Sequence, residues 1–240
     1  TLESTINNMD KGNLVHEVIE QLYLPYKNQI LTVPDFQEMK KRLLHLMEER
    51  YKSIYHGTQQ KTGRNHIIFQ VLKKSILDFL VIEQKQVKEG NQIKILHLEQ
   101  PFEQSVSIPG IDFHVKLIGV VDRIDLYNDT LRIIDYKTGK IEPKHLKLPH
   151  WEVFDEQTEY ASLFQILLYS YVQKSLISQY PKASAGIISF RNLPQYFMSF
   201  SHDSKEEKPL DPENLNRFEV TLFKIINEIF DSKVNFEDKS

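Results

Sequence analysis

Gly119-Val-Val-Asp-Arg-Ile-Asp125, followed after Asn128-Asp129 by Ile133-Ile-Asp-Tyr-Lys-Thr-Gly139, is the stretch of sequence that decides the fold. Both segments are rich in Val and Ile, which favour strands, and the Asn-Asp pair between them is typical of a turn. The stretch therefore predicts a β-hairpin. Because successive side chains of a strand alternate between its faces, we expect Asp135 and Lys137 to project together, with their apolar neighbours on the other side.

The run from Asp122 to Asp125 holds two carboxylates, and their spacing predicts that they point to different faces of the strand. They lie three residues apart, and in a regular strand an odd separation places side chains on opposite faces. Without a bulge, only one of them can face a site shared with Asp135. We expect the other to point across the sheet or towards the hairpin end, and to pair with Arg123 or Arg132.

Helical patterns precede the hairpin and follow it. Apolar residues recur at helical spacing over residues 13–24, 34–55, 65–89, 157–180 and 211–230, the last opened by Asp211 and Pro212. Strand patterns occupy residues 93–99, 111–127, 131–136 and 185–190. This order of elements predicts an α/β or α+β domain with a mixed central sheet.

Length and composition predict one globular domain. The chain has 240 residues, of which 40% are hydrophobic and 26% charged, enough to bury one sizeable core. We expect a single domain over residues 1–240, with a helical N-terminal part at 10–90, a core at about 91–200 and a C-terminal helix at 211–230. Since the first residue is Thr1 and not Met, we expect the domain to be excised from a longer chain.

Cysteine is absent from the sequence, which excludes disulfides, thiol nucleophiles, cysteine-bound zinc and iron–sulfur clusters. Any metal site must therefore use oxygen and imidazole ligands. No apolar run approaches the ~18 residues of a membrane span, and the N-terminus lacks a basic segment followed by an apolar one. We expect neither secretion nor a membrane partner, and the absence of cysteine fits a cytoplasmic location.

The charge balance does not by itself indicate a nucleic-acid partner. The net charge is −3 with a pI near 6.3, so no global positive field surrounds the molecule. A local groove can still supply phosphate contacts. Residues 137–147 are the candidate, with four lysines and a histidine against Glu142, although such a run is also typical of a solvated loop. Trp151 is either a platform on which a base stacks or, more simply, an anchoring residue.

Two aspartates and a lysine on neighbouring strands suit phosphodiester hydrolysis. Mg²⁺ prefers oxygen ligands and typically takes one or two protein carboxylates, which leaves positions for water and a substrate phosphate. It lowers the pKa of bound water and offsets the charge that develops on the phosphate. We expect Lys137 to stay protonated, and to stabilise that charge or orient the water.

At these residues the sequence resembles the PD-(D/E)xK nuclease superfamily, and most closely its RecB-like branch. Besides the two strand segments, three motifs carry the resemblance: Gly12-Asn-Leu-Val-His-Glu-Val-Ile-Glu20, Glu99-Gln-Pro-Phe102 and Gln165-Ile-Leu-Leu-Tyr169. Together they extend over roughly residues 10–190. The resemblance implies a mixed sheet flanked by helices, that is, a restriction-endonuclease-like core with a helical N-terminal part.

The resemblance implies a role for each matched residue. The metal, Mg²⁺ or Mn²⁺, would be held by His16, Asp122, Asp135 and the backbone carbonyl of Tyr136. Lys137 would be the catalytic lysine. Gln165 and Tyr169 would support that lysine or contact the substrate.

The motif match also selects Asp122, and not Asp125, as the metal ligand of its strand. Asp122 follows Gly119 by three residues, and the absent side chain there could leave room for the substrate backbone. Several relatives in the RecB-like branch hold a four-cysteine iron–sulfur cluster, which this chain cannot. That points to cluster-free members, commonly domains attached to helicases or helicase-like proteins in recombination and repair.

Each motif taken alone has a simpler interpretation. An Asp-x-Lys pair on a strand is commonly a surface ion pair, His16 could be a core histidine paired with Glu20, and Gln165 and Tyr169 could be a partly buried helix face. We interpret the set together as a metal-dependent DNA nuclease, an exonuclease or end-processing enzyme. Its partners would be DNA and a helicase-like subunit or other domains of the same chain. The alternative is a catalytically silent nucleic-acid-binding or scaffolding module of a recombination complex.

Overall fold

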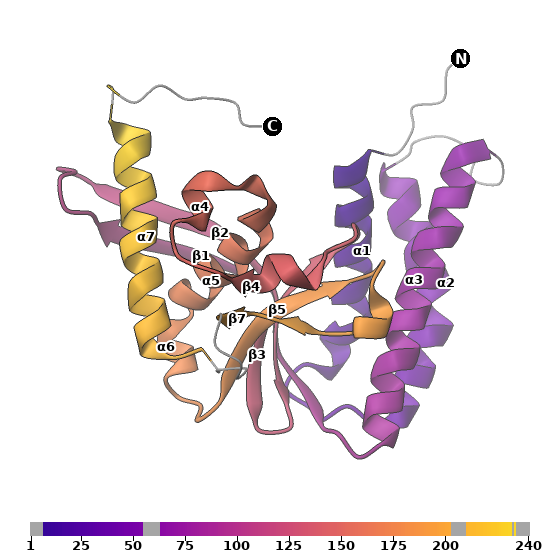
Figure 1. Cartoon of the computed structure of the whole chain (residues 1–240). Coiled ribbons are helices and arrows are strands. Elements are labelled where there is room, and N and C mark those ends of the chain that lie inside the picture. Colours follow the sequence, from indigo (N-terminus) through magenta and orange to yellow (C-terminus); the bar gives the residue numbers. More distant parts are fainter. Residues whose placement is uncertain (1–6, 55–62, 203–209, 232, 234–240) are drawn as a thin grey trace.

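Helices lie on both sides of a central sheet in the computed structural model (Figure 1), which describes residues 7–54, 63–202, 210–231 and 233. One side carries the long helices α1 (Asn8–Tyr23), α2 (Val33–Ile54) and α3 (Gly63–Lys88). The other carries α4 (Val153–Glu156), α5 (Ala161–Val172), α6 (Lys174–Ile177) and α7 (Pro212–Phe230). Among the described helices, none is long and apolar enough to cross a membrane.

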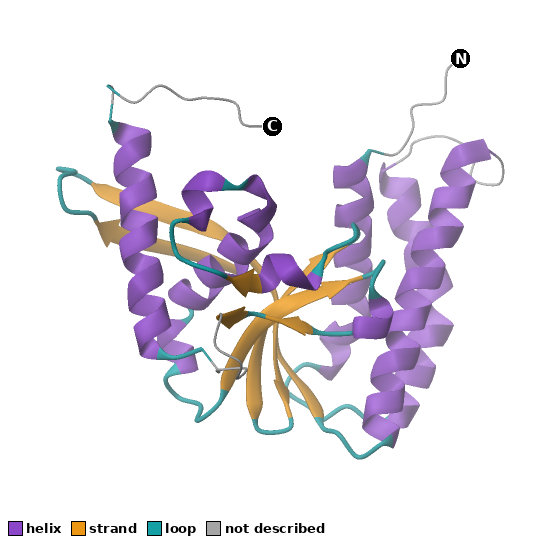
Figure 2. Cartoon of the chain, in the orientation of Figure 1, coloured by secondary structure: helices purple, strands orange, loops and turns teal. Residues whose placement is uncertain are grey.

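The central sheet is mixed, as the sequence predicts (Figure 2). Its strands are β1 (Ile93–Ser107), β2 (His114–Tyr127), β3 (Thr130–Lys137), β5 (Ala183–Ser189) and β6 (Met198–Ser199), in the order β1-β2-β3-β5-β6. Only β3 and β5 pair in parallel, and the other neighbours pair antiparallel. A small second sheet joins β4 (Lys147–Leu148) to β7 (Ser201–His202). The α/β class with flanking helices is therefore confirmed.

Alternation along the strands divides the buried side chains between two cores. Ile134 and Tyr136 of β3 belong to the core that α1, α2 and α3 cover, together with residues such as Phe79. Ile133, the neighbour of Ile134, belongs to the core on the other face, together with Phe218 of α7. The period of two therefore decides which layer each strand residue meets.

The first strand is longer than its sequence pattern indicates. It continues through Pro101 to Ser107, whereas the prediction ended it at Glu99. Proline lacks the N–H that an inner strand needs, but β1 lies at the edge of the sheet, where proline is tolerated. The next strand begins at His114 and not at residue 111, because the turn before it contains Gly110 with φ of 91°.

The predicted helix over residues 157–180 is divided in the structure. A 3₁₀ turn at Thr158–Tyr160 precedes α5, and Gln173, with φ of −98° and ψ of 12°, separates α5 from α6. Capping residues account for the starts of two other helices, α1 and α7. Asp211 caps α7 as predicted by accepting from the backbone N of Asn214 at 2.7 Å, and Asn7 caps α1 in the same way, so that α1 begins earlier than expected.

A group of buried charges joins the helical layer to the sheet. Arg132 binds both oxygens of Asp125, at 2.8 Å each, and Arg123 donates to the same carboxylate at 2.7 Å. Arg123, completely buried, also meets Glu83 of α3 at 3.0 Å. The prediction that Asp125 pairs with Arg123 or Arg132 is confirmed, since it pairs with both. Burial raises the pKa of Asp125, but the two guanidinium groups outweigh it and hold the pKa below its ordinary value.

Tyrosine hydroxyls complete this group. Tyr23 of α1 donates to Glu83 at 2.6 Å, and Tyr196 donates to the other oxygen of Glu83 at 2.5 Å. The Tyr136 hydroxyl accepts from Arg123 at 3.2 Å. With two arginines and two carboxylates, the group balances its charge without solvent, which is the condition under which buried ions are tolerated.

Replacing Asp125 with Ala should destabilise the fold strongly, because it leaves two buried guanidinium groups against a single carboxylate. Breaking a buried pair in this way typically lowers the free energy of unfolding by about 3–5 kcal/mol. Asp78→Asn is the matched control, because it breaks only the exposed pair with Lys74, worth roughly 0.5 kcal/mol. Urea denaturation of both variants measures the difference, and equal midpoints would contradict a structural role for Asp125.

Candidate functional site

The sheet forks at Asp122 and Asp135. β2 pairs with β3 from Tyr127↔Thr130 as far as Arg123↔Ile134, and the pairing stops there. Past that point β2 remains with β1 and β3 remains with β5, so that the two arms diverge (Figure 1). The first residues beyond the last pair are the two aspartates. Asp122 Oδ2 accepts a hydrogen bond from the backbone N of Tyr136 at 2.7 Å, which replaces a bond that the ladder no longer supplies.

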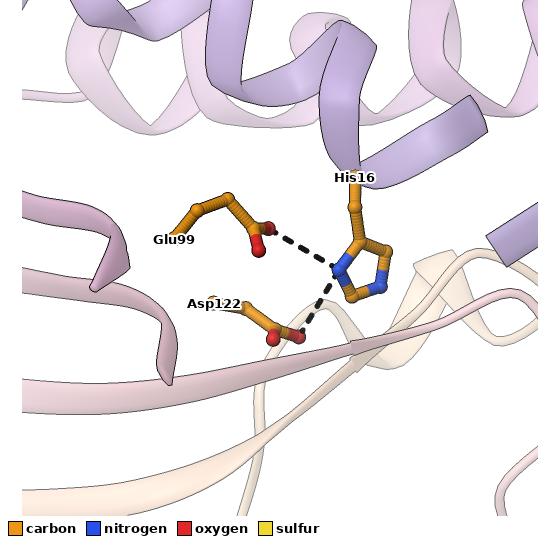
Figure 3. Close-up of side chains that lie close together, drawn as sticks. All are labelled: His16, Glu99 and Asp122. Carbon is orange, nitrogen blue, oxygen red and sulfur yellow. Dashed lines mark ion pairs between the residues drawn. The ribbon is translucent and has the colours of Figure 1, made fainter. Parts of the chain in front are cut away.

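His16 reaches this fork from α1. Its Nδ1 lies 3.2 Å from Glu99 Oε1 and 3.6 Å from Asp122 Oδ2, and Figure 3 shows both carboxylates directed at the ring. Its Nε2 lies 3.1 Å from the carbonyl oxygen of Tyr136. The apolar stripe of α1 packs against the sheet and leaves His16 at the edge of that contact, half-buried. His16, Asp122 and the Tyr136 carbonyl, matched through separate motifs, therefore lie together.

Glu99 is the member of this cluster that the sequence did not assign as a metal ligand. The register of β1 and β2 places it opposite Asp122, so both side chains leave the same face. Its backbone has φ of 42°, in the left-handed region that a residue with a side chain seldom adopts. His16, Glu99 and Asp122 each offer a ligand atom, and these atoms lie within 4.8 Å of one another. The sequence did hold a signal for this ligand, because Glu99 belongs to the Glu99-Gln-Pro-Phe102 motif and lies on the strand next to that of Asp122.

Asp135 lies on the other side of the fork, only 1% exposed. Its Oδ1 accepts from Lys137 Nζ at 3.2 Å, and its Oδ2, which forms no hydrogen bond in the described structure, lies 3.1 Å from the same ammonium group. As alternation predicts, Asp135 and Lys137 leave the same face of β3. Lys137 therefore supplies the charge partner of this carboxylate, and Oδ2 keeps a hydrogen-bonding capacity that a cation or a water can satisfy.

Lys137 is held by side chains of α5. Its Nζ donates to Gln165 Oε1 at 2.7 Å, and the Gln165 amide donates to the hydroxyl of Tyr169 at 2.6 Å. Because Gln165 and Tyr169 are one helical turn apart, they share a face of α5. The interpretation of these two as an ordinary helix face is incomplete, because their polar groups form one chain that ends on Lys137.

The cluster is electrostatically strained as it stands. Burial raises the pKa of Asp122 to about 7, and the neighbouring Asp135 adds to that rise. Burial, above all, also raises the pKa of Asp135. Burial alone would lower the pKa of His16, but its hydrogen bond to Glu99 and the charge of Asp122 outweigh it and raise the pKa to about 9. Two carboxylates, Glu99 and Asp122, therefore face one protonated ring, while the nearby Asp135 raises the pKa of Asp122 further.

This donor set fits a divalent cation. It offers carboxylate oxygens, a backbone carbonyl and one imidazole, the ligand types that Mg²⁺ and Mn²⁺ accept. The Asp135 Oδ2, which accepts no hydrogen bond in the described structure, and the mutual repulsion of the carboxylates both favour a cation at the fork. The imidazolium of His16 and the ammonium group of Lys137 supply the positive charges there, and the His16 ring must give up a proton before it can bind a metal.

The model of the PD-(D/E)XK nuclease superfamily matches the sequence over residues 2–240. The chain belongs to this superfamily. Members are nucleases that use divalent metal ions, which agrees with the His16, Glu99 and Asp122 cluster. The family predicted from the sequence is therefore confirmed.

Searches for individual relatives add little to the superfamily match. No curated protein sequence matches the chain closely enough to count as a relative. Among solved structures, a protein described as SSO0001 matches with 13% identity over 93% of this chain and 88% of its own, at a TM-score of 0.27.

Other expectations need correction for this PD-(D/E)XK chain. Gly119 does not leave room for a substrate, because the ring of Phe102 fills that space and a Cβ atom at Gly119 would lie 2.7 Å from it. The observed partner of His16 is Glu99 and not Glu20. Trp151 packs against Phe154 and His202, which supports the anchoring interpretation.

The basic segment 137–147 is less basic in space than in sequence. Lys140 and Lys144 both pair with Glu142, at 3.5 and 3.2 Å, and His145 pairs with Glu159 at 2.8 Å. These charges are largely neutralised by their neighbours. The segment therefore behaves more as a solvated loop than as a free phosphate-binding strip.

Adding Mn²⁺ should raise the melting temperature of the protein, because a cation that binds the folded site and not the unfolded chain stabilises the fold by linkage. The shift should disappear in Asp135→Ala and in Asp122→Asn, whereas both variants should melt without metal at or above the wild-type temperature, since each removes carboxylate repulsion. Calorimetric or fluorescence melts with MnCl₂ and with EDTA measure this. Glu103→Gln, which changes an exposed carboxylate on β1, is the control. An equal Mn²⁺ shift in all four proteins would exclude the fork as the metal site.

Proposed function

We propose that this chain is a Mg²⁺- or Mn²⁺-dependent deoxyribonuclease that cleaves phosphodiester bonds, as an exonuclease or end-processing enzyme in DNA recombination or repair. The observation that carries the proposal is the fork of the sheet, which gathers His16, Glu99, Asp122, Asp135 and Lys137 around one point. We treat residues 1–240 as a single nuclease domain of the RecB-like branch, with a helicase-like partner.

The metal would be held by His16, Asp122, Asp135 and the carbonyl of Tyr136, with Glu99 as an additional ligand. When bound, a divalent cation lowers the pKa of a coordinated water and offsets the charge that accumulates on the phosphate in the transition state. Asp122 and Asp135 lie on either side of the position at which the cation would contact the phosphate. The sheet fixes the backbone that carries these two aspartates. Their side chains therefore need to move little during the reaction.

Lys137 would act on the phosphate or on the attacking water. Its ammonium group is held by Asp135 and Gln165, at 3.2 and 2.7 Å, so two of its three protons are committed and the third is free to bind a phosphate oxygen or the water. Tyr169 keeps the Gln165 amide oriented, because the amide nitrogen donates to the tyrosine hydroxyl. Gln165 and Tyr169 are therefore positioning residues for Lys137.

Lys137→Ala should lower the rate of cleavage by about two to three orders of magnitude, as the loss of a preorganised donor usually does, while the stabilisation by Mn²⁺ persists. The variant would then show that Lys137 acts in the cleavage step and is not needed for metal binding. Steady-state cleavage and thermal melts on the same preparation measure the two effects. Lys140→Ala, a lysine beyond the end of β3 that pairs with Glu142, is the matched control. If Lys137→Ala cleaves at the wild-type rate, the Asp-x-Lys pair is structural.

The substrate class is tested by incubating the protein with Mg²⁺ or Mn²⁺ and single-stranded, linear duplex or circular DNA. We expect cleavage of linear DNA and resistance of closed circles, because an exonuclease needs an end. Hydrolysis of circles would show an endonuclease instead. Binding to DNA without hydrolysis under any condition would select the alternative, a silent nucleic-acid-binding or scaffolding module.

A further inference from the structure

A pocket opens at the carboxyl ends of β3 and β5, next to the candidate site but not part of it. Its volume is about 490 Å³, within the range of sites that hold small ligands. α3 forms one wall with Ile67, Ile68, Val71, Leu72 and Ser75, α1 adds Asn8 and Lys11, and the strand ends add Thr138, Gly139, Phe190 and Arg191.

Short covalent and hydrogen-bonded links join this pocket to the fork. Thr138 and Gly139 directly follow Lys137, and Lys11 lies five residues before His16 on the same helix. The backbone N of Phe190 donates to the carbonyl of Lys137 at 2.9 Å, and the Ser189 hydroxyl donates to the carbonyl of Gly139 at 2.7 Å. The pocket therefore begins at the end of the strand that carries Lys137, next to the fork.

The charges that line the pocket are of one sign. Lys11 and Arg191 are its charged residues, and no acidic residue lines it. Within the described ranges, neither forms an ion pair, although Lys11 Nζ donates to Asn8 Oδ1 at 3.1 Å. This differs from segment 137–147, where Lys140 and Lys144 both pair with Glu142. A polyanion would therefore find uncompensated positive charge here and not there.

The wall that α3 forms is mostly apolar and open to solvent. Ile67 is 64% exposed and Val71 is 55% exposed, a large exposure for side chains of this kind on a long helix. Such a wall can contact the flat face of a nucleobase only where the base is unstacked and unpaired, because a duplex hides those faces in its stack.

We propose that this pocket binds an unpaired nucleotide of the strand that the fork cleaves, with the base against Ile67 and Val71 and the flanking phosphates on Lys11 and Arg191. The assignment rests on the proposed nuclease function and adds a specificity to it: a preference for strands with a single-stranded end. A protein segment could also cover an apolar wall, but the two basic residues and the continuity with Lys137 favour a nucleic acid.

The test measures the binding of a short fluorescein-labelled oligothymidylate to the full chain in EDTA, by anisotropy at several KCl concentrations. Lys11→Ala combined with Arg191→Ala should weaken binding and reduce the slope of log Kd against log salt by about 1.4, the value for two lost phosphate contacts on a single strand. Val71→Glu should weaken binding about tenfold, as the loss of one base contact does. Val220→Glu is the matched control, because Val220 is 71% exposed on the distant helix α7.

Cleavage of single-stranded DNA by the same variants separates this proposal from the proposed function. We expect the KM of the pocket variants to rise while kcat changes little. Wild-type cleavage with unchanged Kd and KM in the variants would overturn the pocket and leave the nuclease function standing. Weaker binding by the variants, without cleavage by any form, would leave the pocket and remove the nuclease function.

Two further outcomes would also overturn the assignment. An equal loss of affinity for blunt duplex would mean that the pocket contacts phosphates alone and not an unpaired base. A change in the mass of the protein in solution on Val71→Glu, with DNA binding intact, would mean that the wall is a protein interface. Melting temperatures close to wild type, expected because none of these side chains is buried, ensure that the comparison is between folded proteins.

Discussion

The buried contact between Arg123 and its two carboxylate partners is the interaction on which the rest of the structure depends. Glu83 belongs to the helical layer and Asp125 to the sheet, and Arg123 cannot be buried without both. Once α3 is fixed in this way, the packing of α1 beside it is also fixed. His16 then reaches Asp122, which neighbours Arg123 in sequence and leaves the opposite face of the strand. Arg123 thus sets the docking of the helices, and the residue before it, Asp122, uses that docking to contact His16.

A second principle separates stability from function in this molecule. On one face of β2, opposite charges are matched and closed off from water. At the fork, carboxylates outnumber the basic groups, and one oxygen of Asp135 accepts no hydrogen bond within the described residues. Natural proteins tolerate such local conflict where a ligand resolves it. Adjacent residues of one strand therefore contribute in opposite ways, because Arg123 stabilises the fold whereas Asp122 stores repulsion that a cation would relieve.

Much of this arrangement could be predicted from the sequence, because it follows from strand periodicity. The shared face of Asp135 and Lys137, and the pairing of Asp125 with arginine, both follow from the alternation of side chains. Glu99 was not assigned, because its direction depends on a left-handed backbone that no local pattern of residues announces. Glu83 was missed for another reason: its partner lies far along the chain, and a glutamate in an amphipathic helix looks like any exposed charge until the helix is docked. The break at Gln173 was missed because no glycine or proline marks it.

Gly119 shows how a residue of the hairpin strand can act at a distance. The missing side chain admits the ring of Phe102, which lies edge-on against Tyr169, and the Tyr169 hydroxyl receives the amide that holds Lys137. A methyl group at position 119 would displace that ring towards α5 and disturb the lysine through Tyr169 and Gln165. The two positions are therefore expected to covary among homologues: a larger residue at 119 requires a smaller one at 102. Glycine at position 119 is then explained by the packing of Phe102 and Tyr169 next to the lysine.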